Sequence, residues 1–437
     1  MRPLAGLRIA VTIPPTQWFG GIDYAFAIEM TDEMRALGAN IFEVDVYPCW
    51  LKNRVYIDET IAALRSFRPD VAVSLPNSGY VLPCATPDGE NIFTDILQIP
   101  TIMLWDHGLL QFPKQVLDPL PQDHTASLPG CIERLRRVLN HPLFFHYSPD
   151  RGHIEQMGRF GLIDPAKVHR FLQPAYPNFI RYGYSRNRGG GYASRVAFAG
   201  NVYIQKSRDV PFRRDKTLGD IENRVLNAKK AHLDECLWDL FMAEVDNLGP
   251  SSAQKLKLTP DSTFFWSFMH DEIEYVGNTE IRLEILKGLK QECDFFGNFI
   301  EPDSLKAFRD APHLRYRRSL EYFTELPLLF MNSDVIVDVI NLGYNSGVSP
   351  KIMGGLACGG LVLFDYKDDF ARSMGESGND VMSRNIDHLN VLIDRYLTYP
   401  RKRIDTIRYL QNRICTEFSF GALSQRFLIE EPVWRKA

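Results

Sequence analysis

Short, continuous apolar runs in the first half of the chain alternate with stretches in which apolar residues recur at helical spacing. The runs that predict strands cover residues 7–13, 41–46, 71–75, 99–104 and 143–147. Helices are predicted between these runs at 22–37 and 59–66. Because uninterrupted apolar strands are typical of sheets that are buried on both faces, this alternation predicts a parallel, doubly wound sheet.

The second half repeats the alternation, with one long helical interruption. Strands are predicted at 195–201, 294–296, 335–339 and 361–364, and helices at 220–250 and 281–290. Between the halves, the segment from Pro174 to Gly191 is dense in proline and glycine, which is typical of a linker. We therefore expect two α/β domains, at 1–175 and 193–400, joined by a linker at 176–192. A helical insertion at about 215–270 and a helical tail at 401–437 complete this division.

Composition places the chain among globular proteins. Its 437 residues exceed what one core usually supports, and 45% apolar with 24% charged residues is an ordinary balance. The net charge of -4 argues against a dedicated nucleic-acid binder, so no nucleic-acid partner is expected. No apolar window is long enough to span a bilayer, and the N-terminus lacks the pattern of a signal peptide.

The cysteines are odd in number and show no close spacing. They are Cys49, Cys84, Cys131, Cys236, Cys293, Cys358 and Cys415. This pattern predicts neither a zinc site nor a disulfide framework, which favours a reducing, cytoplasmic location. His107, His146 and His153 fit no metal-binding spacing, so no metal ligand is expected.

The segment from Leu326 to Asp369 carries the clearest chemical signal. A polar loop at 341–348 separates a predicted strand from a helix that begins at Ser349-Pro350 and ends at Gly359-Gly360. Serine is a preferred N-cap, whose side chain accepts from the first amides, and proline suits the first helical position. Exposed amides at a helix start, with Lys351 in the first turn, suit an anion such as a nucleotide diphosphate. An ordinary capped crossover helix is the alternative interpretation.

Four segments of the second half, in this order, carry a family resemblance. They are VAFAGN at 196–201, IRLEILKGL with CDFFGN within 281–298, YRRSLEYFTELPLLFMNSDVIVDV at 316–339, and GVSPKIMGGLACGGLVLFD at 347–365. Together they resemble the C-terminal domain of GT-B glycosyltransferases, in the branch of CgeB-like proteins and the group 1 glycosyl transferases. The first half resembles the N-terminal GT-B domain only in architecture. The resemblance implies two Rossmann-like domains facing across a cleft, with the nucleotide sugar on the second and the acceptor on the first.

The resemblance also implies site residues. For the nucleotide sugar they are Gly200, Asn201, Lys206, Asn341, Tyr344, Asn345, Ser346, Gly347, Ser349, Lys351 and Asp365. The loop at Gly20-Gly21 is the expected acceptor side. A base for the acceptor hydroxyl is expected at Asp23, which follows that loop, or at Asp106 with His107 beside it. Asp23 is equally well explained as an acid that complements its helix dipole.

One position departs from the family pattern. The family usually has a glutamate where this chain has Gly354, and a second acid where it has Ser346. The stereochemistry of transfer and the usual contact with the donor ribose are therefore left open.

Three functions remain in view. The leading hypothesis is a glycosyltransferase, independent of metal, that uses an unidentified nucleotide sugar and a glycan, lipid-linked or small-molecule acceptor. The alternatives are another sugar-nucleotide enzyme, such as an epimerase or hydrolase, and a non-catalytic sugar-binding or structural relative. No cofactor is expected. The basic run Arg401-Lys402-Arg403 is interpreted as a solvated face, with an anionic membrane surface as its alternative partner.

Overall fold

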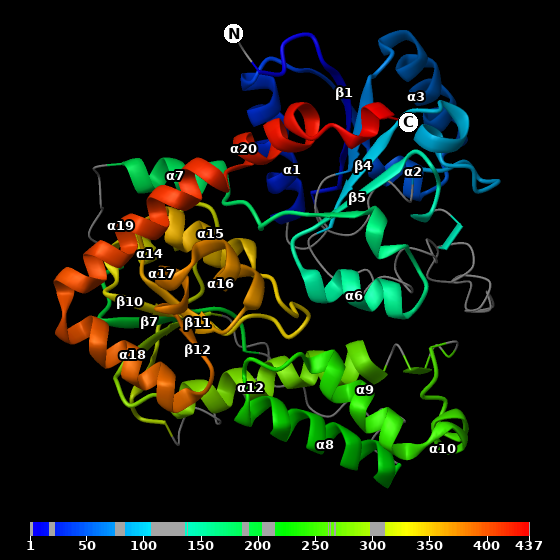
Figure 1. Cartoon of the computed structure of the whole chain (residues 1–437). Helices are drawn as coiled ribbons and strands as arrows, with labels where there is room; N and C mark the ends of the chain where they lie inside the picture. Colours follow the sequence, from blue (N-terminus) through cyan, green and yellow to red (C-terminus); the bar gives the residue numbers. More distant parts are fainter. Residues whose placement is uncertain are drawn as a thin grey trace. The chain divides into compact units, whose positions relative to one another are not determined.

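The computed structural model divides the chain into two compact units. Unit 1 comprises Met1–Pro177 and Glu417–Ala437, and unit 2 comprises Asn178–Thr416 (Figure 1). The residues that the structure describes are 3–16, 22–74, 84–105, 136–137, 139–185, 192–202, 215–260, 262, 264–265, 268–297 and 311–436.

Unit 1 is built on a six-stranded parallel sheet in the order β2-β1-β3-β4-β5-β6. Its strands are β1 (Arg8–Ile13), β2 (Asn40–Asp45), β3 (Val71–Ser74), β4 (Thr101–Leu104), β5 (Phe144–Ser148) and β6 (Val168–Arg170). Its helices include α1 (Ile22–Ala36), α2 (Val46–Trp50), α3 (Arg54–Phe67) and α6 (Arg151–Arg159), with short turns η2 (Ile92–Ile96) and η4 (Pro165–Lys167). β3 and β4 are buried along their whole length, as expected for strands covered on both faces.

The last segment of the chain completes unit 1. It contains α20 (Phe420–Gln425), η7 (Arg426–Glu430) and η8 (Val433–Lys436). Phe420 packs edge to face on Phe26 of α1, with ring centroids 4.7 Å apart, and the amide of Ala175 donates to the carbonyl of Phe418. The segment that the sequence suggested as one tail, 401–437, is thus shared between the two units.

Unit 2 is built on a second six-stranded parallel sheet, in the order β12-β11-β10-β7-β8-β9. Its strands are β7 (Val196–Ala199), β8 (Cys293–Phe296), β9 (Leu314–Tyr316), β10 (Val335–Val337), β11 (Val362–Asp365) and β12 (Met382–Ser383). The helices that follow β9 are α14 (Leu326–Asn332), α15 (Pro350–Ala357), α16 (Asp368–Met374), α17 (Glu376–Asn379), α18 (Ile386–Thr398) and α19 (Pro400–Glu417). Helix α7 (Pro177–Tyr184) lies where the sequence predicted a linker.

A helical excursion separates β7 from β8. It contains α8 (Lys216–Ala231), α9 (Leu237–Leu248), α10 (Pro250–Lys255), η6 (Phe268–Glu274) and α12 (Tyr275–Lys287), which lie beside one another in Figure 1. Asp215 caps α8 by accepting from the amides of Thr217 and Leu218. α12 returns the chain to the sheet, where its residue Arg282 reaches the ends of β7 and β10.

Both sheets have a switch point where the order of strands reverses. In unit 2 it lies between β7 and β10, because β8 and β9 extend the sheet on one side of β7 while β10 to β12 extend it on the other. In unit 1 it lies between β1 and β3. Ligands of open α/β sheets bind outside the carboxyl ends of strands at such points, which directs attention to the residues that follow β7 and β10.

Candidate functional site

Lys351 lies at the switch point of unit 2 and is already engaged within the protein. From the first turn of α15, its Nζ lies 2.8 Å from Oδ1 of Asp338, directly after β10. It also donates to the carbonyl of Ala199, the last residue of β7, at 2.8 Å. The side chains of Lys351 and Asp338 are 21% and 4% exposed. Lys351 therefore ties α15 to both central strands, and Asp338 balances its charge.

Arg282 supplies a second cation at the same point. Its Nη1 donates to the carbonyl of Asn201 at 3.1 Å, and its Nε and Nη2 both lie 3.4 Å from the carbonyl of Val339. Asn201 follows β7 and Val339 follows β10, so the guanidinium bridges the two strand ends. Carbonyl oxygens accept hydrogen bonds, so these contacts orient the guanidinium. Nothing in the sequence indicated the position of this residue.

Gly297 allows the ends of β7 and β8 to approach each other closely at Gly200. The amide of Gly200 donates to the carbonyl of Phe296 in β8 at 2.9 Å. A Cβ atom on Gly297 would lie 2.0 Å from the carbonyl oxygen of Gly200, so only glycine fits at Gly297. The ends of β7 and β8 are therefore in direct backbone contact beside the switch point.

The first part of the loop after β10 is fixed by a side chain of α12. Asn278 donates to Oδ1 of Asn341 at 3.1 Å and accepts from the amide of Leu342 at 2.7 Å. Oδ1 of Asn341 also accepts from the amide of Gly343 at 2.8 Å. The side-chain oxygen of Asn341 therefore helps to hold the loop in its conformation.

A buried pair at the end of β11 holds the middle of the loop. Asp365 and Lys367 are 5% and 3% exposed, and their charged atoms lie 3.2 Å apart. Lys367 also donates to the carbonyl of Tyr344 at 2.7 Å, and Asp365 accepts from the amide of Ile340 at 2.8 Å. Lys229 of α8 lies near this pair; its burial, and then the positive charge of Lys367, lower its pKa to about 8.

The last part of the loop is tied to α16 and to the excursion. Ser346 donates to Asp369 through its hydroxyl at 2.6 Å and accepts from the amide of Asp369 at its carbonyl. The thiol of Cys236 lies 3.2 Å from Oδ1 of Asn345. Gly347 follows directly and is buried. The predicted residues Tyr344 and Asp365 are thus joined through Lys367, and the predicted residue Asn201 is joined to Arg282 at the end of β7.

Ser349 occupies the N-cap position of α15, as predicted, but its side chain does not make the capping hydrogen bond. Its backbone is extended, and its hydroxyl makes no capping hydrogen bond. Its carbonyl instead accepts from the amides of Ile352 and Met353, at 3.1 and 3.3 Å. The expected acceptance by the serine side chain is therefore wrong. Pro350 does occupy the first helical position.

Gly354 packs against an aromatic ring. A Cβ atom at this position would lie 2.7 Å from Cδ1 of Phe179, a ring in α7 that is fully buried. The space in which the family glutamate would begin is therefore filled by Phe179. A longer side chain at this position would have to displace that ring.

The predicted residues of unit 1 are only partly within the described chain. Asp23 lies in the first turn of α1 and is 3% exposed. Gly20, Gly21, Asp106 and His107 lie outside the described residues, as does Lys206 of unit 2.

Two other histidines of unit 1, His146 and His153, are buried and make hydrogen bonds within the unit. His146 in β5 accepts from Nε1 of Trp105 at 3.2 Å and contacts the carbonyl of Leu139 at 2.8 Å. Burial lowers its pKa to about 4. His153 lies 3.8 Å from Asp150, which also caps α6 by accepting from the His153 amide. Across the described ranges, no group of three potential metal ligands is found.

The basic clusters are largely paired with acids. Arg315 and Arg317 both bind Asp294, which is 5% exposed on its side chain. Burial favours a raised pKa for Asp294, but hydrogen bonds from Ser194 and the two arginines outweigh it and lower the pKa. Further pairs join Arg318 to Glu325, Lys402 to Asp380 and Arg403 to Asp334. Within the part of the chain that the structure describes, no helix is long and apolar enough to cross a membrane.

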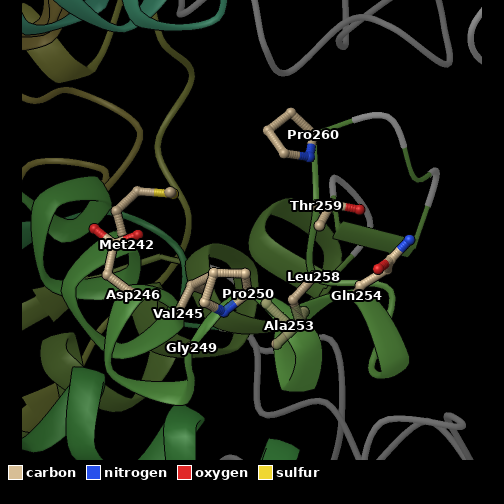
Figure 2. Close-up of a pocket in the computed structure, with 10 residues that line it drawn as sticks. All are labelled: Met242, Val245, Asp246, Gly249, Pro250, Ala253, Gln254, Leu258, Thr259 and Pro260. Atoms are coloured by element: carbon tan, nitrogen blue, oxygen red, sulfur yellow. The ribbon is translucent and has the colours of Figure 1, made fainter.

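A cavity of about 440 Å³ lies in the helical excursion, away from the switch point (Figure 2). Figure 2 shows Met242, Val245 and Asp246 of α9 on one side and Ala253 and Gln254 of α10 on the other. None of the residues predicted for the nucleotide sugar lines it.

Comparison with known proteins places the fold. No family model matches the chain, and no curated protein sequence does. A glycosyltransferase structure from Rickettsia africae matches over 98% of both chains, with a TM-score of 0.54 and 9% identity. T4 phage BGT in complex with its UDP-glucose substrate matches with a TM-score of 0.49 and 10% identity, over 97% of this chain and 99% of that one. Anabaena Alr3699/HepE in complex with UDP and glucose matches with a TM-score of 0.47 and 8% identity, over 98% and 99%.

The fold belongs to the GT-B class. The chain has two successive units, each with a parallel six-stranded sheet and flanking helices, and the Rickettsia glycosyltransferase shares this order over nearly its whole length. The expected α/β fold class is confirmed. At 9% identity the likeness extends to the fold and no further.

Proposed function

We propose that the protein is a glycosyltransferase, which moves a sugar from a nucleotide-sugar donor to an acceptor hydroxyl. The observation that carries the proposal is the pair of cations at the switch point of unit 2. Arg282 and Lys351 approach the same two strand ends from different helices. The matching fold of the Rickettsia protein, which is described as a glycosyltransferase, supports the same reading.

The two cations have different roles in this proposal. Sugar transfer needs positive groups where the leaving diphosphate develops charge. Arg282 is the main diphosphate ligand, because a guanidinium binds phosphate oxygens through two parallel hydrogen bonds. Lys351 is chiefly a positioning residue, since Asp338 and the carbonyl of Ala199 already hold its ammonium. The loop at 341–347 and the turn at Gly200-Asn201 would surround the nucleotide.

The proposal also covers the role of metal, the base, the acceptor and the family. Transfer is expected to proceed without a divalent metal, with the guanidinium of Arg282 as the positive group at the diphosphate. The base is Asp23, Asp106 or His107 of unit 1, as the sequence predicts. The acceptor is a glycan, a lipid-linked sugar or a small molecule, and the product belongs to a surface glycan or glycoconjugate. The CgeB-like branch of the group 1 glycosyl transferases remains the proposed family.

Calorimetry with UDP, GDP and dTDP tests the diphosphate site. Arg282→Gln should weaken the best of these ligands by about 10- to 100-fold, the range for a lost charge-assisted contact. Lys287→Gln, an exposed residue at the end of the same helix, is the matched control and should bind as the wild type does. Equal affinity in both variants, with the folds intact by circular dichroism, would remove Arg282 from the site.

A panel of nucleotide sugars then distinguishes the possible reactions. Release of nucleotide that depends on an added acceptor supports transfer. Release without acceptor indicates a hydrolase, a change in the sugar alone indicates an epimerase, and tight binding without turnover indicates a binding protein. Repeating the assay with EDTA tests the role of metal: activity lost on chelation and restored by manganese would overturn the metal-free proposal.

A further inference from the structure

Two buried cysteines of unit 1 lie in contact, although 34 residues separate them in the sequence. Cys49 is in α2, which follows β2, and Cys84 belongs to the segment that follows β3. Both side chains have no exposed surface, and the Cys84 thiol makes a side-chain hydrogen bond with the Cys49 thiol. Sequence spacing alone gave no sign of this pairing.

Lys52 fixes the backbone on both sides of the contact. Its amide donates to the carbonyl of Cys49 at 3.0 Å, and its Nζ donates to the carbonyl of Ala85 at 3.2 Å. The carbonyl of Cys84 accepts from the amide of Ile92 at 2.8 Å. The segments that carry the two hydrogen-bonded thiols are therefore joined to each other and held by backbone acceptors.

We propose that Cys49 and Cys84 form a redox-sensitive pair, which a peroxide oxidises to an intramolecular disulfide. In the first step, one thiolate attacks hydrogen peroxide, forms a sulfenic acid and releases hydroxide. In the second, the neighbouring thiol attacks the sulfenic sulfur and water leaves. Altogether, two thiols lose two electrons and two protons, and one peroxide is reduced to two waters. This inference is independent of the proposed transferase activity.

The position of the pair gives the bridge a structural consequence. β2 and β3 flank β1, so α2 and the segment around Cys84 both follow strands at the carboxyl-terminal edge of the unit 1 sheet. The bridge would join them beside the switch point between β1 and β3. Because the adjacent Cys49 thiol and burial raise the pKa of Cys84, the thiolate is scarce at neutral pH and oxidation should accelerate as the pH rises.

Mass spectrometry of the folded protein after treatment with hydrogen peroxide tests the proposal. Non-reducing digestion should give one linked pair of peptides, containing Cys49 and Cys84, with a mass lower by two hydrogen atoms. Dithiothreitol should reverse the link. The oxidised protein should unfold at a temperature roughly 5 to 10 °C higher, because the bridge constrains the unfolded chain.

Variants and an internal control make the result decisive. Cys49→Ala and Cys84→Ala should each abolish the linked peptide, and the remaining cysteine should be trapped by a sulfenic-acid reagent. Cys293 is equally buried, but its thiol contacts the carbonyl of Asp294, so it should appear in no disulfide-linked peptide. The proposal is overturned if both thiols of the folded wild type stay reduced while the same peroxide treatment oxidises glutathione added to the sample. Separate oxidation of the two cysteines to sulfinic acid would overturn it equally.

Discussion

The ion pair between Lys351 and Asp338 allows the two roles of Lys351 to be separated. Lys351→Met removes the ammonium and leaves the carboxylate of Asp338, which is 4% exposed, without its counter-ion. Breaking a buried ion pair typically costs about 3 to 5 kcal/mol. Because Lys351 is 21% exposed, water screens the pair in part, and we expect a loss of about 2 to 3 kcal/mol.

Asp338→Asn should cost less, about 1 kcal/mol, because the ammonium keeps its hydrogen bond to Ala199 and reaches water. The double variant should be more stable than the sum of the single losses predicts, by about 1.5 to 2 kcal/mol, since it leaves no buried charge unpaired. Lys402→Met is the control for an exposed pair: Lys402 and Asp380 are 46% and 39% exposed, so the loss should stay below about 1 kcal/mol.

Urea unfolding and hydrogen exchange together give the measurement. A chain of two units need not unfold in one step, so the exchange of the β7 and β10 amides reports the local loss directly. If Lys351→Met is as stable as Lys402→Met, the Lys351–Asp338 pair makes no special contribution to the free energy of unfolding. If it then also binds diphosphate about 10-fold or more weakly, Lys351 is a direct ligand, as its position at the helix start suggests.

Three further predictions follow from buried groups. Lys229 has a pKa of about 8 in the folded protein, against an ordinary value of 10.5, so folding releases its proton between these two values. The stability of the wild type relative to Lys229→Met should rise by ~1.4 kcal/mol per pH unit in this window, as measured by urea unfolding. His146 has a pKa of about 4 in the folded protein, against an ordinary value of 6.5, so the wild type should lose stability as the pH is lowered from 6.5 to 4, whereas His146→Gln should show a flatter profile. Gly354→Glu should destabilise unit 2 by about 2 to 4 kcal/mol through its clash with Phe179. Adding Phe179→Ala should not restore full stability, because removing the ring opens a cavity elsewhere. A Gly354→Glu protein with the unfolding temperature of the wild type would contradict this packing.

Much of the fold was predictable because parallel strands in a buried sheet are continuous apolar runs. The predicted strand at 71–75 corresponds to β3, and the predicted helix at 22–37 to α1. Ends were less predictable: the helix predicted at 59–66 begins at Arg54, because Asn53 caps it by accepting from the Tyr56 amide. Asparagine before a polar turn is a weak signal, and the tertiary packing of α3 determines how far the helix extends.

The candidate site was predictable only where position along a strand determines it. Gly200, Asn201 and Asp365 follow or end apolar strands, and the carboxyl ends of parallel strands meet at one edge. Asp338 was counted within the strand predicted at 335–339, yet β10 ends at Val337. The signal available in the sequence was a charged residue near the end of an apolar run, which is where residues at the carboxyl edge of a sheet occur.

The position of Arg282 was not available from local pattern. It lies 57 residues before Val339, whose carbonyl it contacts, on a helix that reaches β7 and β10 only because the excursion returns there. No helical spacing within α12 distinguishes an arginine that contacts two strand ends from one that faces water. The same reasoning applies to Lys351: its charge suggested an anion site, but its pairing with Asp338 could not be predicted from the sequence. A cation at a helix start therefore indicates a phosphate site only once its partners in the fold are known, and at this switch point Lys351 proves to be paired with Asp338.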